Sequence, residues 1–211
     1  MNKITTIASL MLAATLLGSC AAIADIDVAA GPNGGDGHNP LCPGMAATSG
    51  NIDPTGAADG DHLIGPLDVD RVVDGDTLIV ETGCGAATVR IIGIDTPETV
   101  HPDRPVEPFG PEASAAAAAI LEGHRVVLET DPGQDLKDRY GRVLAHVWTI
   151  QESAGAPGIQ DIRLGDLVSV TLAEQGLADE LIIGGESSHA ETISRARGKA
   201  IAQGEGMWGG N

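Results

Sequence analysis

The sequence predicts an α+β fold that is mainly a small closed β-barrel, with three helices packed around it and with a signal peptide and a flexible linker in front. Three observations predict this fold. Segments of strand length that are rich in Val, Ile and Leu follow one another from Leu67 onward. A run of alanines with high helix propensity interrupts them. Two further segments with helical spacing or a helix-start pattern end the chain.

Residues 1–24 have the pattern of a signal peptide. Lys3 gives a short positive start, residues 7–17 form an apolar run, and small residues follow. The run is too short for a comfortable transmembrane span. We therefore expect a protein that a bacterium exports from its cytoplasm.

Two cleavage sites in this leader remain open. Residues 17–20, Leu-Gly-Ser-Cys, resemble a bacterial lipoprotein box, which would leave an acylated Cys20 as the new N-terminus of an outer-membrane lipoprotein. Residues 22–24, Ala-Ile-Ala, form a small-x-small site that would release a soluble secreted or periplasmic protein. An N-terminal lipid is the only membrane attachment that we expect.

Residues 25–66 have the composition of a flexible linker, and residues 67–211 that of one domain. The linker is rich in Gly, Pro, Asp, Asn and Ser, so it cannot bury enough apolar surface to offset its chain entropy. Cys42 in the linker and Cys84 in the domain form a candidate disulfide in an exported protein, although two free thiols are the alternative. A Cys42–Cys84 bond would pin the linker to the domain.

Five strands are expected in the domain. The first three are separated by Asp-Gly-Asp and by the turn around Cys84, and the last two are bounded by polar and Gly-rich segments; the five cover residues 67–73, 77–82, 87–94, 125–129 and 143–150.

Three helices complete the prediction. The first covers residues 113–121, after Pro111 at a favourable first position, and Gly123 ends it. The second covers residues 164–174 before Gly176, and the third runs from a Ser188–Glu191 capping box to about residue 203. Five strands with a helix between the third and fourth suit a closed barrel of OB type.

Three polar clusters contain the groups that phosphodiester hydrolysis needs. They are Asp74-Gly75-Asp76-Thr77, then Arg90 followed by Asp95-Thr96-Pro97-Glu98-Thr99, then Asp138-Arg139-Tyr140-Gly141-Arg142. Each alone is compatible with an ordinary turn. Together they offer hard oxygen ligands for a cation, a carboxylate to act on water, and two guanidinium groups for phosphate oxygens.

Spacing alone does not bring these groups together. Arg90 and Asp95 have opposite parity on a regular strand, so they would point to opposite faces of the sheet. A bulge or bend near Gly93 is therefore required.

The order of the motifs resembles the staphylococcal nuclease (thermonuclease) family. The sequences DGDT, R-x4-DTPET, HP, GPEAS, DRYGR-x-LA and EQGLA occur in the family's order and at similar spacing, over roughly residues 67–208. The resemblance implies an enzyme, a Ca²⁺-dependent phosphodiesterase that cleaves DNA and RNA and leaves 3′-phosphate products.

The resemblance also implies a role for each matching residue. Asp76, Asp95 and the backbone carbonyl of Thr96 would bind Ca²⁺, and Asp74 would be an acid close behind the metal. Glu98 would hold or deprotonate the attacking water, while Arg90 and Arg142 would clamp the phosphate. Arg139 and Tyr140 would contact the nucleotide's other phosphate.

Some features depart from the family pattern. Residues 181–186, LIIGGE, lack the tyrosines that line the base pocket of the family's prototype, so weaker substrate binding is expected. The 134–138 loop is one residue longer than the prototype's. The formal net charge of −18 would by itself exclude a nucleic-acid partner, so bound cations must matter if the substrate is DNA or RNA.

The alternative function is a non-catalytic barrel of the same family that binds nucleic acid or protein at the cell surface. Such a protein would not need the complete set of acids and arginines, which this sequence retains. We expect the protein to be a monomer.

Overall fold

The computed structural model describes residues 41, 52–53, 63–99, 105–152, 162–182 and 187–210. All of them lie in one compact unit, residues 36–211. The predicted signal peptide, its lipobox at Cys20, Cys42 and most of the 25–66 linker lie outside the described residues.

Five strands close into a barrel, as predicted. They are β2 (Leu63–Asp74), β3 (Thr77–Thr82), β4 (Gly85–Ile91), β6 (Arg125–Glu129) and β7 (Val143–Glu152). β2 pairs with both β3 and β6, and β7 pairs with both β4 and β6, so the five strands form a closed ring. The β4–β7 pairing is parallel and the other four are antiparallel. The fold class read from the sequence, a five-stranded barrel of OB type, is confirmed.

Alternate side chains of the barrel strands form the core. Leu78 and Val80 of β3 and Val89 and Ile91 of β4 are essentially inaccessible to solvent. Their spacing of two residues is that of side chains on one face of a strand. The same core includes Val126, Leu128, Val143, Ala145 and Val147 from β6 and β7.

Short strands extend this frame. β8 (Ile162–Leu167) pairs antiparallel with β7, and β1 (Ile52–Asp53) pairs parallel with β8. β5 (Gly93–Asp95) and β9 (Asp179–Leu181) form a separate two-stranded sheet.

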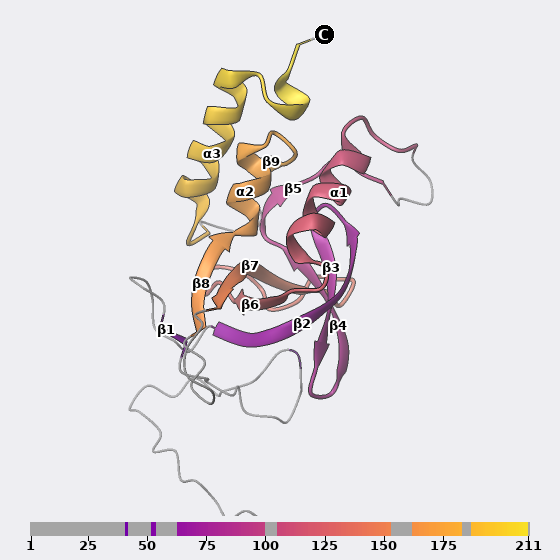
Figure 1. Ribbon diagram of the computed structural model, residues 1–211, viewed down its shortest axis with the longest axis vertical. Helices are drawn as coiled ribbons and strands as arrows, with labels where there is room; N and C mark the ends of the chain where they lie inside the picture. Colours follow the sequence, from indigo (N-terminus) through magenta and orange to yellow (C-terminus); the bar gives the residue numbers. More distant parts are fainter. Residues whose placement is uncertain are drawn as a thin grey trace, which may run out of the picture. The chain divides into compact units, whose positions relative to one another are not determined.

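Three α-helices pack against the barrel. They are α1 (Gly110–Leu121), α2 (Val168–Glu174) and α3 (Ala190–Gln203), and a 3₁₀ turn, Gly206–Trp208, follows α3. α1 contacts β2, and α2 contacts both β7 and α3, which lies beside it in Figure 1. In the described part of the chain, no helix has the length and apolar character that a membrane span requires.

The structure differs from the prediction at several boundaries. The strand predicted over residues 87–94 is divided into β4 and β5, because the chain bends at Gly93. β2 begins at Leu63 rather than residue 67, because Leu63 and Ile64 pair with β6 and are buried. The predicted helix 164–174 begins only at Val168, because residues 162–167 pair with β7. The Ser188–Glu191 capping box does not form; α3 begins at Ala190, its N-cap makes no side-chain hydrogen bond, and the Ser188 amide donates to Asp131.

Cys84, in the turn between β3 and β4, is disulfide-bonded. Its partner lies outside the described residues, as does Cys42. The carbonyl oxygen of Leu41 lies 3.2 Å from the Cys84 sulfur, and the Leu41 side chain is buried in the barrel core. Residue 41 therefore packs on the domain, and the Cys42–Cys84 pairing remains our prediction.

Candidate active site

The turn between β2 and β3 places Asp76 against the loop that follows β5. Asp76 is only 6% exposed, and its Oδ2 accepts hydrogen bonds from the Thr96 amide at 3.1 Å and the Thr96 hydroxyl at 3.2 Å. Gly75 makes this approach feasible, since a Cβ there would lie 2.7 Å from the Thr96 hydroxyl oxygen. The Asp74–Thr77 segment and the loop that contains Thr96 are therefore in contact at Gly75, which has no side chain.

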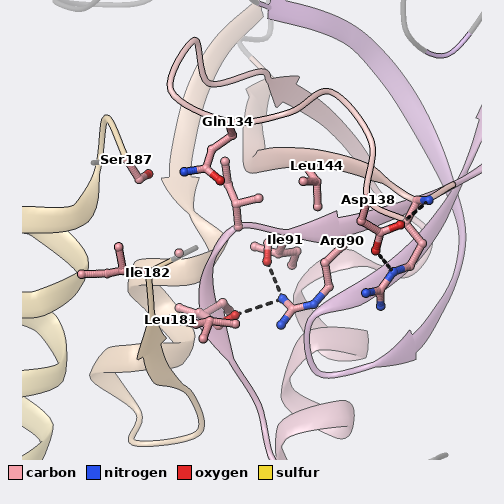
Figure 2. A pocket seen from close by; sticks show the side chains of 12 residues that line it. Arg90, Ile91, Gln134, Asp138, Leu144, Leu181, Ile182 and Ser187 are labelled. Carbon is pink, nitrogen blue, oxygen red and sulfur yellow. Dashed lines mark hydrogen bonds and ion pairs between the residues drawn. The ribbon is translucent and has the colours of Figure 1, made fainter. Parts of the chain in front are cut away.

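A bend after β4 brings Arg90 to Asp95. Ile92 lies between β4 and β5, and Gly93 has a φ of 86°, so the chain turns where the sequence requires it. Arg90 Nη2 then lies 3.0 Å from Asp95 Oδ1 and 3.1 Å from Asp76 Oδ2. Figure 2 shows the Arg90 side chain on the pocket wall, with hydrogen bonds from its guanidinium to backbone carbonyl oxygens.

The carboxylates of Asp76 and Asp95 converge on one point, because both lie about 3 Å from the same guanidinium nitrogen. Burial raises the pKa of Asp95, and the charges of Asp76, Glu107 and Glu98 add to this effect while Arg90 opposes it. Burial and the charge of Asp76 likewise raise the pKa of Asp74 to about 6. The site therefore holds more negative charge than Arg90 balances.

This donor set fits a hard divalent cation. Asp95 is 61% exposed on its side chain, so a cation could reach it from solvent, and carboxylate oxygens are the ligands that Ca²⁺ prefers. Among the described residues, no three His, Cys, Asp or Glu side chains are grouped so that they could hold a metal by themselves. A cation bound by Asp76 and Asp95 must therefore also take backbone carbonyl oxygens and water.

Arg142 is joined to the same site through Thr77. Its Nε donates to Asp138 Oδ2 at 2.7 Å, and its Nη1 lies 3.5 Å from the Thr77 hydroxyl oxygen. That hydroxyl donates to Asp76 Oδ1 at 3.1 Å. Burial raises the pKa of Asp138, but the hydrogen bonds from Arg142 outweigh it, so the pKa lies below its ordinary value. The carboxylate of Asp138 thus stays ionised and fixes the direction of Arg142.

Glu107 holds the backbone of Glu98 in place. The Glu98 amide donates to the Glu107 carboxylate at 3.0 Å, and the Glu98 carbonyl oxygen accepts from the Glu107 amide at 2.9 Å. Gly110, at the start of α1, lies so close that a Cβ would come within 2.9 Å of the same carbonyl oxygen. The Glu98 carboxylate accepts a hydrogen bond from the Thr99 amide at 3.1 Å, and its charge makes a small contribution to raising the pKa of Asp95.

Arg139 and Tyr140 lie on the outer side of Arg142. The Arg139 guanidinium donates to the Tyr140 hydroxyl at 2.6 Å and lies 4.7 Å from the ring centroid, while the Arg142 guanidinium lies 5.5 Å from it. Tyr140 is 68% exposed. Its ring is therefore open to solvent but already in contact with two cationic groups.

A pocket of about 260 Å³ lies between the two arginines and an aliphatic wall (Figure 2). Its polar lining consists of Arg90, Gln134, Asp138, Arg142 and Ser187. Leu144, Leu181 and Ile182 form much of the rest. None of the described residues that line it is aromatic; residues 183–186, which belong to the segment without tyrosines, lie outside the described residues.

Three contributors received no role from the sequence. Thr77 connects Arg142 to Asp76, Asp138 orients Arg142, and Glu107 holds the Glu98 backbone. The i,i+4 spacing of Asp138 and Arg142 around a Gly turn could have indicated their contact. Nothing local in the sequence indicates the roles of Thr77 and Glu107, because these roles depend on tertiary contacts.

The fold and the site together define a class: an OB-type barrel with a pocket between two arginines, beside carboxylates suited to a hard cation. Comparison with known proteins agrees. Residues 88–210 match the family model described as staphylococcal nuclease homologue. The chain is 37% identical to a thermonuclease of Staphylococcus hyicus over 138 residues, 65% of this chain and 72% of that protein.

Two further relatives are similar. A thermonuclease of Staphylococcus intermedius is 38% identical over 141 residues, 66% of this chain and 74% of that protein. The SPbeta prophage-derived endonuclease YokF of Bacillus subtilis is 38% identical over 110 residues, 52% of this chain and 32% of that protein. The chain belongs to the staphylococcal nuclease family.

Proposed function

We propose that this protein is an exported, Ca²⁺-dependent nuclease that hydrolyses phosphodiester bonds of DNA, RNA or both and leaves 3′-phosphate products. Family membership and the relatives called thermonuclease or endonuclease support hydrolysis of nucleic acid. The observation that carries the proposal is the convergence of Asp76, Asp95 and Arg90 on one point, with Arg142 joined to it through Thr77.

The two arginines match the charge that hydrolysis creates. When the oxygen of water attacks phosphorus and the bond to the 5′-oxygen of the leaving nucleoside breaks, negative charge grows on the phosphoryl oxygens. Arg90 and Arg142 offer planar forks that can bind two such oxygens and also fix their positions. Glu98 is the group we assign to the water, whose proton it accepts as the oxygen attacks.

Asp76, Asp95 and the carbonyl of Thr96 are the groups that would hold Ca²⁺, with Asp74 behind them. The cation would supply a fixed positive charge beside the phosphate and offset the burial and the repulsion that raise the pKa values of Asp74 and Asp95. It would also allow an acidic protein to bind a polyanion, since the formal net charge is −18.

Export is supported by the leader sequence and by the disulfide at Cys84. Disulfides persist in oxidising compartments, and Cys84 is disulfide-bonded. We keep both predicted forms, a lipoprotein acylated on Cys20 and a soluble protein cleaved after residue 24. A monomer fits either form, because every residue assigned to the site belongs to one chain.

Digestion of single-stranded DNA and of RNA by the purified protein, with Ca²⁺ or with chelator, tests the proposal. We expect cleavage only with Ca²⁺ and 3′-phosphate ends in the mass spectrum of the products. Glu98→Gln and Arg142→Lys should each lower kcat by about a hundredfold or more, because each removes a group that acts in the transition state.

Matched controls lie on α3, away from the site. Glu191→Gln and Arg195→Lys make the same chemical changes in an exposed ion pair and should retain wild-type activity. Wild-type rates in Glu98→Gln and Arg142→Lys, with unchanged circular dichroism spectra, would show that the reaction occurs elsewhere or not at all.

A further inference from the structure

Leu41, a residue of the segment predicted to be a flexible linker, is part of the barrel core. Its side chain is only 7% exposed and belongs to the same core as Val89 of β4 and Val143 of β7. These two valines pair with each other where β4 and β7 meet. Leu41 also lines a pocket of about 320 Å³ together with Thr88 and Arg142. It therefore lies at the β4–β7 junction, beside the arginine that precedes β7.

A disulfide lies directly against this residue. The carbonyl oxygen of Leu41 is 3.2 Å from the sulfur of Cys84, and Cys84 is disulfide-bonded. Cys42 follows Leu41 in the sequence, whereas Cys20 precedes it by a long stretch of chain. Covalent geometry therefore favours Cys42 as the cysteine within bonding reach of Cys84. The contact at Leu41 supports the predicted Cys42–Cys84 pairing.

The β3–β4 hairpin fixes the position of Cys84. The Cys84 amide donates to the Thr82 hydroxyl oxygen at 3.2 Å, and the two strands pair without interruption from this turn to their other end. At that other end Thr77 pairs with Arg90, and both belong to the candidate site. The disulfide thus joins the chain at Leu41 to the hairpin that carries Arg90.

The docking of Leu41 depends on this covalent bond. Burial of one leucine side chain stabilises a contact by about as much as the ordering of a few backbone residues costs, so docking without a cross-link would be marginal. A disulfide offsets this cost because it also restricts the unfolded chain. Without it, the equilibrium should shift toward a barrel from which Leu41 has been released.

From these contacts we infer that the disulfide at Cys84 is a redox switch: a dithiol reductant releases Leu41 from the barrel and lowers the activity of the candidate site. One thiolate of the reductant attacks the disulfide and expels a protein thiolate, and its second thiol then resolves the mixed disulfide. The protein gains two electrons and two protons and ends with two thiols, while the reductant becomes a disulfide.

The effect on activity would pass through Arg142. Release of Leu41 removes a wall beside Arg142 and uncovers the start of β7, so the guanidinium is held less firmly. Small displacements of a group that binds the reacting phosphate are costly in rate. This inference rests on the proposed nuclease function and adds a dependence on the redox state of the compartment.

The test compares oxidised wild-type protein with the same protein reduced by dithiothreitol and with Cys84→Ala. On single-stranded DNA at fixed Ca²⁺, the reduced protein and Cys84→Ala should both have a kcat about threefold to tenfold lower than that of the oxidised protein. Their Tm should be lower by about 5–10 °C. Dithiothreitol should change neither quantity further in Cys84→Ala, which shows that it acts through this disulfide.

Leu41→Ala separates the side chain from the bond. This variant retains Cys84 and its disulfide, and in the oxidised state it should show the same loss of kcat as the reduced wild type. Ile201→Ala is the matched control, because Ile201 is an exposed aliphatic residue of α3, and it should have wild-type kcat in both redox states. Reduced wild type or Leu41→Ala with the kcat of the oxidised protein would overturn the inference.

Hydrogen exchange without DNA and Ca²⁺ distinguishes this inference from the proposed function. Reduction should speed exchange of the amides of residues 137–145 and leave those of α3 unchanged. If oxidised wild type cleaves nothing, the nuclease proposal fails, while faster exchange in residues 137–145 still supports the release of Leu41. Unchanged exchange in that segment refutes the release, whatever the activity.

Discussion

At the scale of single residues, Arg90 organises the candidate site. Its side chain is 11% exposed and its two terminal nitrogens reach Asp76, Asp95 and two backbone carbonyl oxygens. A lysine could not make these contacts together, because an ammonium on a flexible stem lacks the fixed fork of a guanidinium. The orientation of the Arg90 guanidinium is therefore set by the fold itself.

Ile182 lies in the wall of the pocket that contains Arg90. It is 64% exposed, and none of the described residues in this wall is aromatic. Ile182→Tyr should therefore add a stacking surface for a base and lower KM for single-stranded DNA about fivefold to tenfold, with little change in kcat. Steady-state kinetics at fixed Ca²⁺ and salt measure this effect.

Ile201→Tyr is the control, since Ile201 is also an exposed isoleucine but lies on α3, outside the pocket linings described. An unchanged KM in Ile182→Tyr would mean that bases do not enter the pocket of Arg90 and Leu144.

At the scale of elements, the contact between the β2–β3 turn and the loop after β5 sets the distance between the two acids. Gly75→Ala would place a methyl group 2.7–2.8 Å from the side-chain atoms of Thr96 and push the two segments apart. We expect at least a tenfold loss of kcat, because small displacements of reacting groups are costly. Titrations with Ca²⁺ should show at the same time that a higher Ca²⁺ concentration is needed for half-maximal activity.

Gly198→Ala serves as the matched control. Nothing lies within 4 Å of a Cβ at Gly198 in α3, so this variant should be fully active and slightly more stable. Full activity of Gly75→Ala would mean that the spacing of Asp76 and Asp95 does not limit the reaction.

The sequence predicted the elements whose pattern is local and strong. The five barrel strands follow runs rich in β-branched residues, and the first helix follows a run of alanines. The bend at Gly93 is required because Arg90 and Asp95 are an odd number of residues apart and would otherwise point to opposite faces of the sheet. β9 has three residues and pairs only with β5, and β8 is a strand because β7 lies beside it. Such elements depend on their partners, so a single sequence cannot place them.

The candidate site, like the fold, could be predicted from the sequence only in part. Its acids and arginines were named from motif order, and the structure brings Asp76, Arg90 and Asp95 into contact. The link from Arg142 through Thr77 could not be predicted, because the two residues are 65 positions apart and meet only across the barrel. Motifs predict which groups take part, whereas the closed sheet determines which of them touch.

At the scale of the whole molecule, a buried polar cluster connects β7 to the segment before α3. His146 is fully buried, and its Nε2 lies 3.3 Å from Asp131 Oδ2 and 3.0 Å from the Ser187 hydroxyl oxygen. Burial, followed by the nearby charge of His189, lowers the pKa of His146 to about 4. The imidazole is therefore neutral in the folded protein at neutral pH.

This pKa makes stability depend on pH. In the unfolded chain the pKa of a histidine is near 6.5, so between pH 6.5 and 4 the unfolded state binds the proton and the folded state does not. The free energy of unfolding should fall by about 2 kcal/mol from pH 7 to pH 5 through His146 alone. In His146→Gln that part of the fall should vanish, as measured by urea denaturation at both pH values.

His124→Gln removes an exposed histidine instead and should keep the wild-type difference between the two pH values. If His146→Gln has the same pH dependence as wild type, the buried imidazole does not titrate as described.

The ring of strands has a last consequence, which concerns the chain before it is folded. β7 is the strand that joins β4 to β6, and Arg142 comes immediately before it, whereas Arg90 lies in β4. The two arginines become neighbours only when the ring is complete. A partly formed ring leaves Arg142 apart from Arg90, so the pocket that both of them line exists only in the completed barrel.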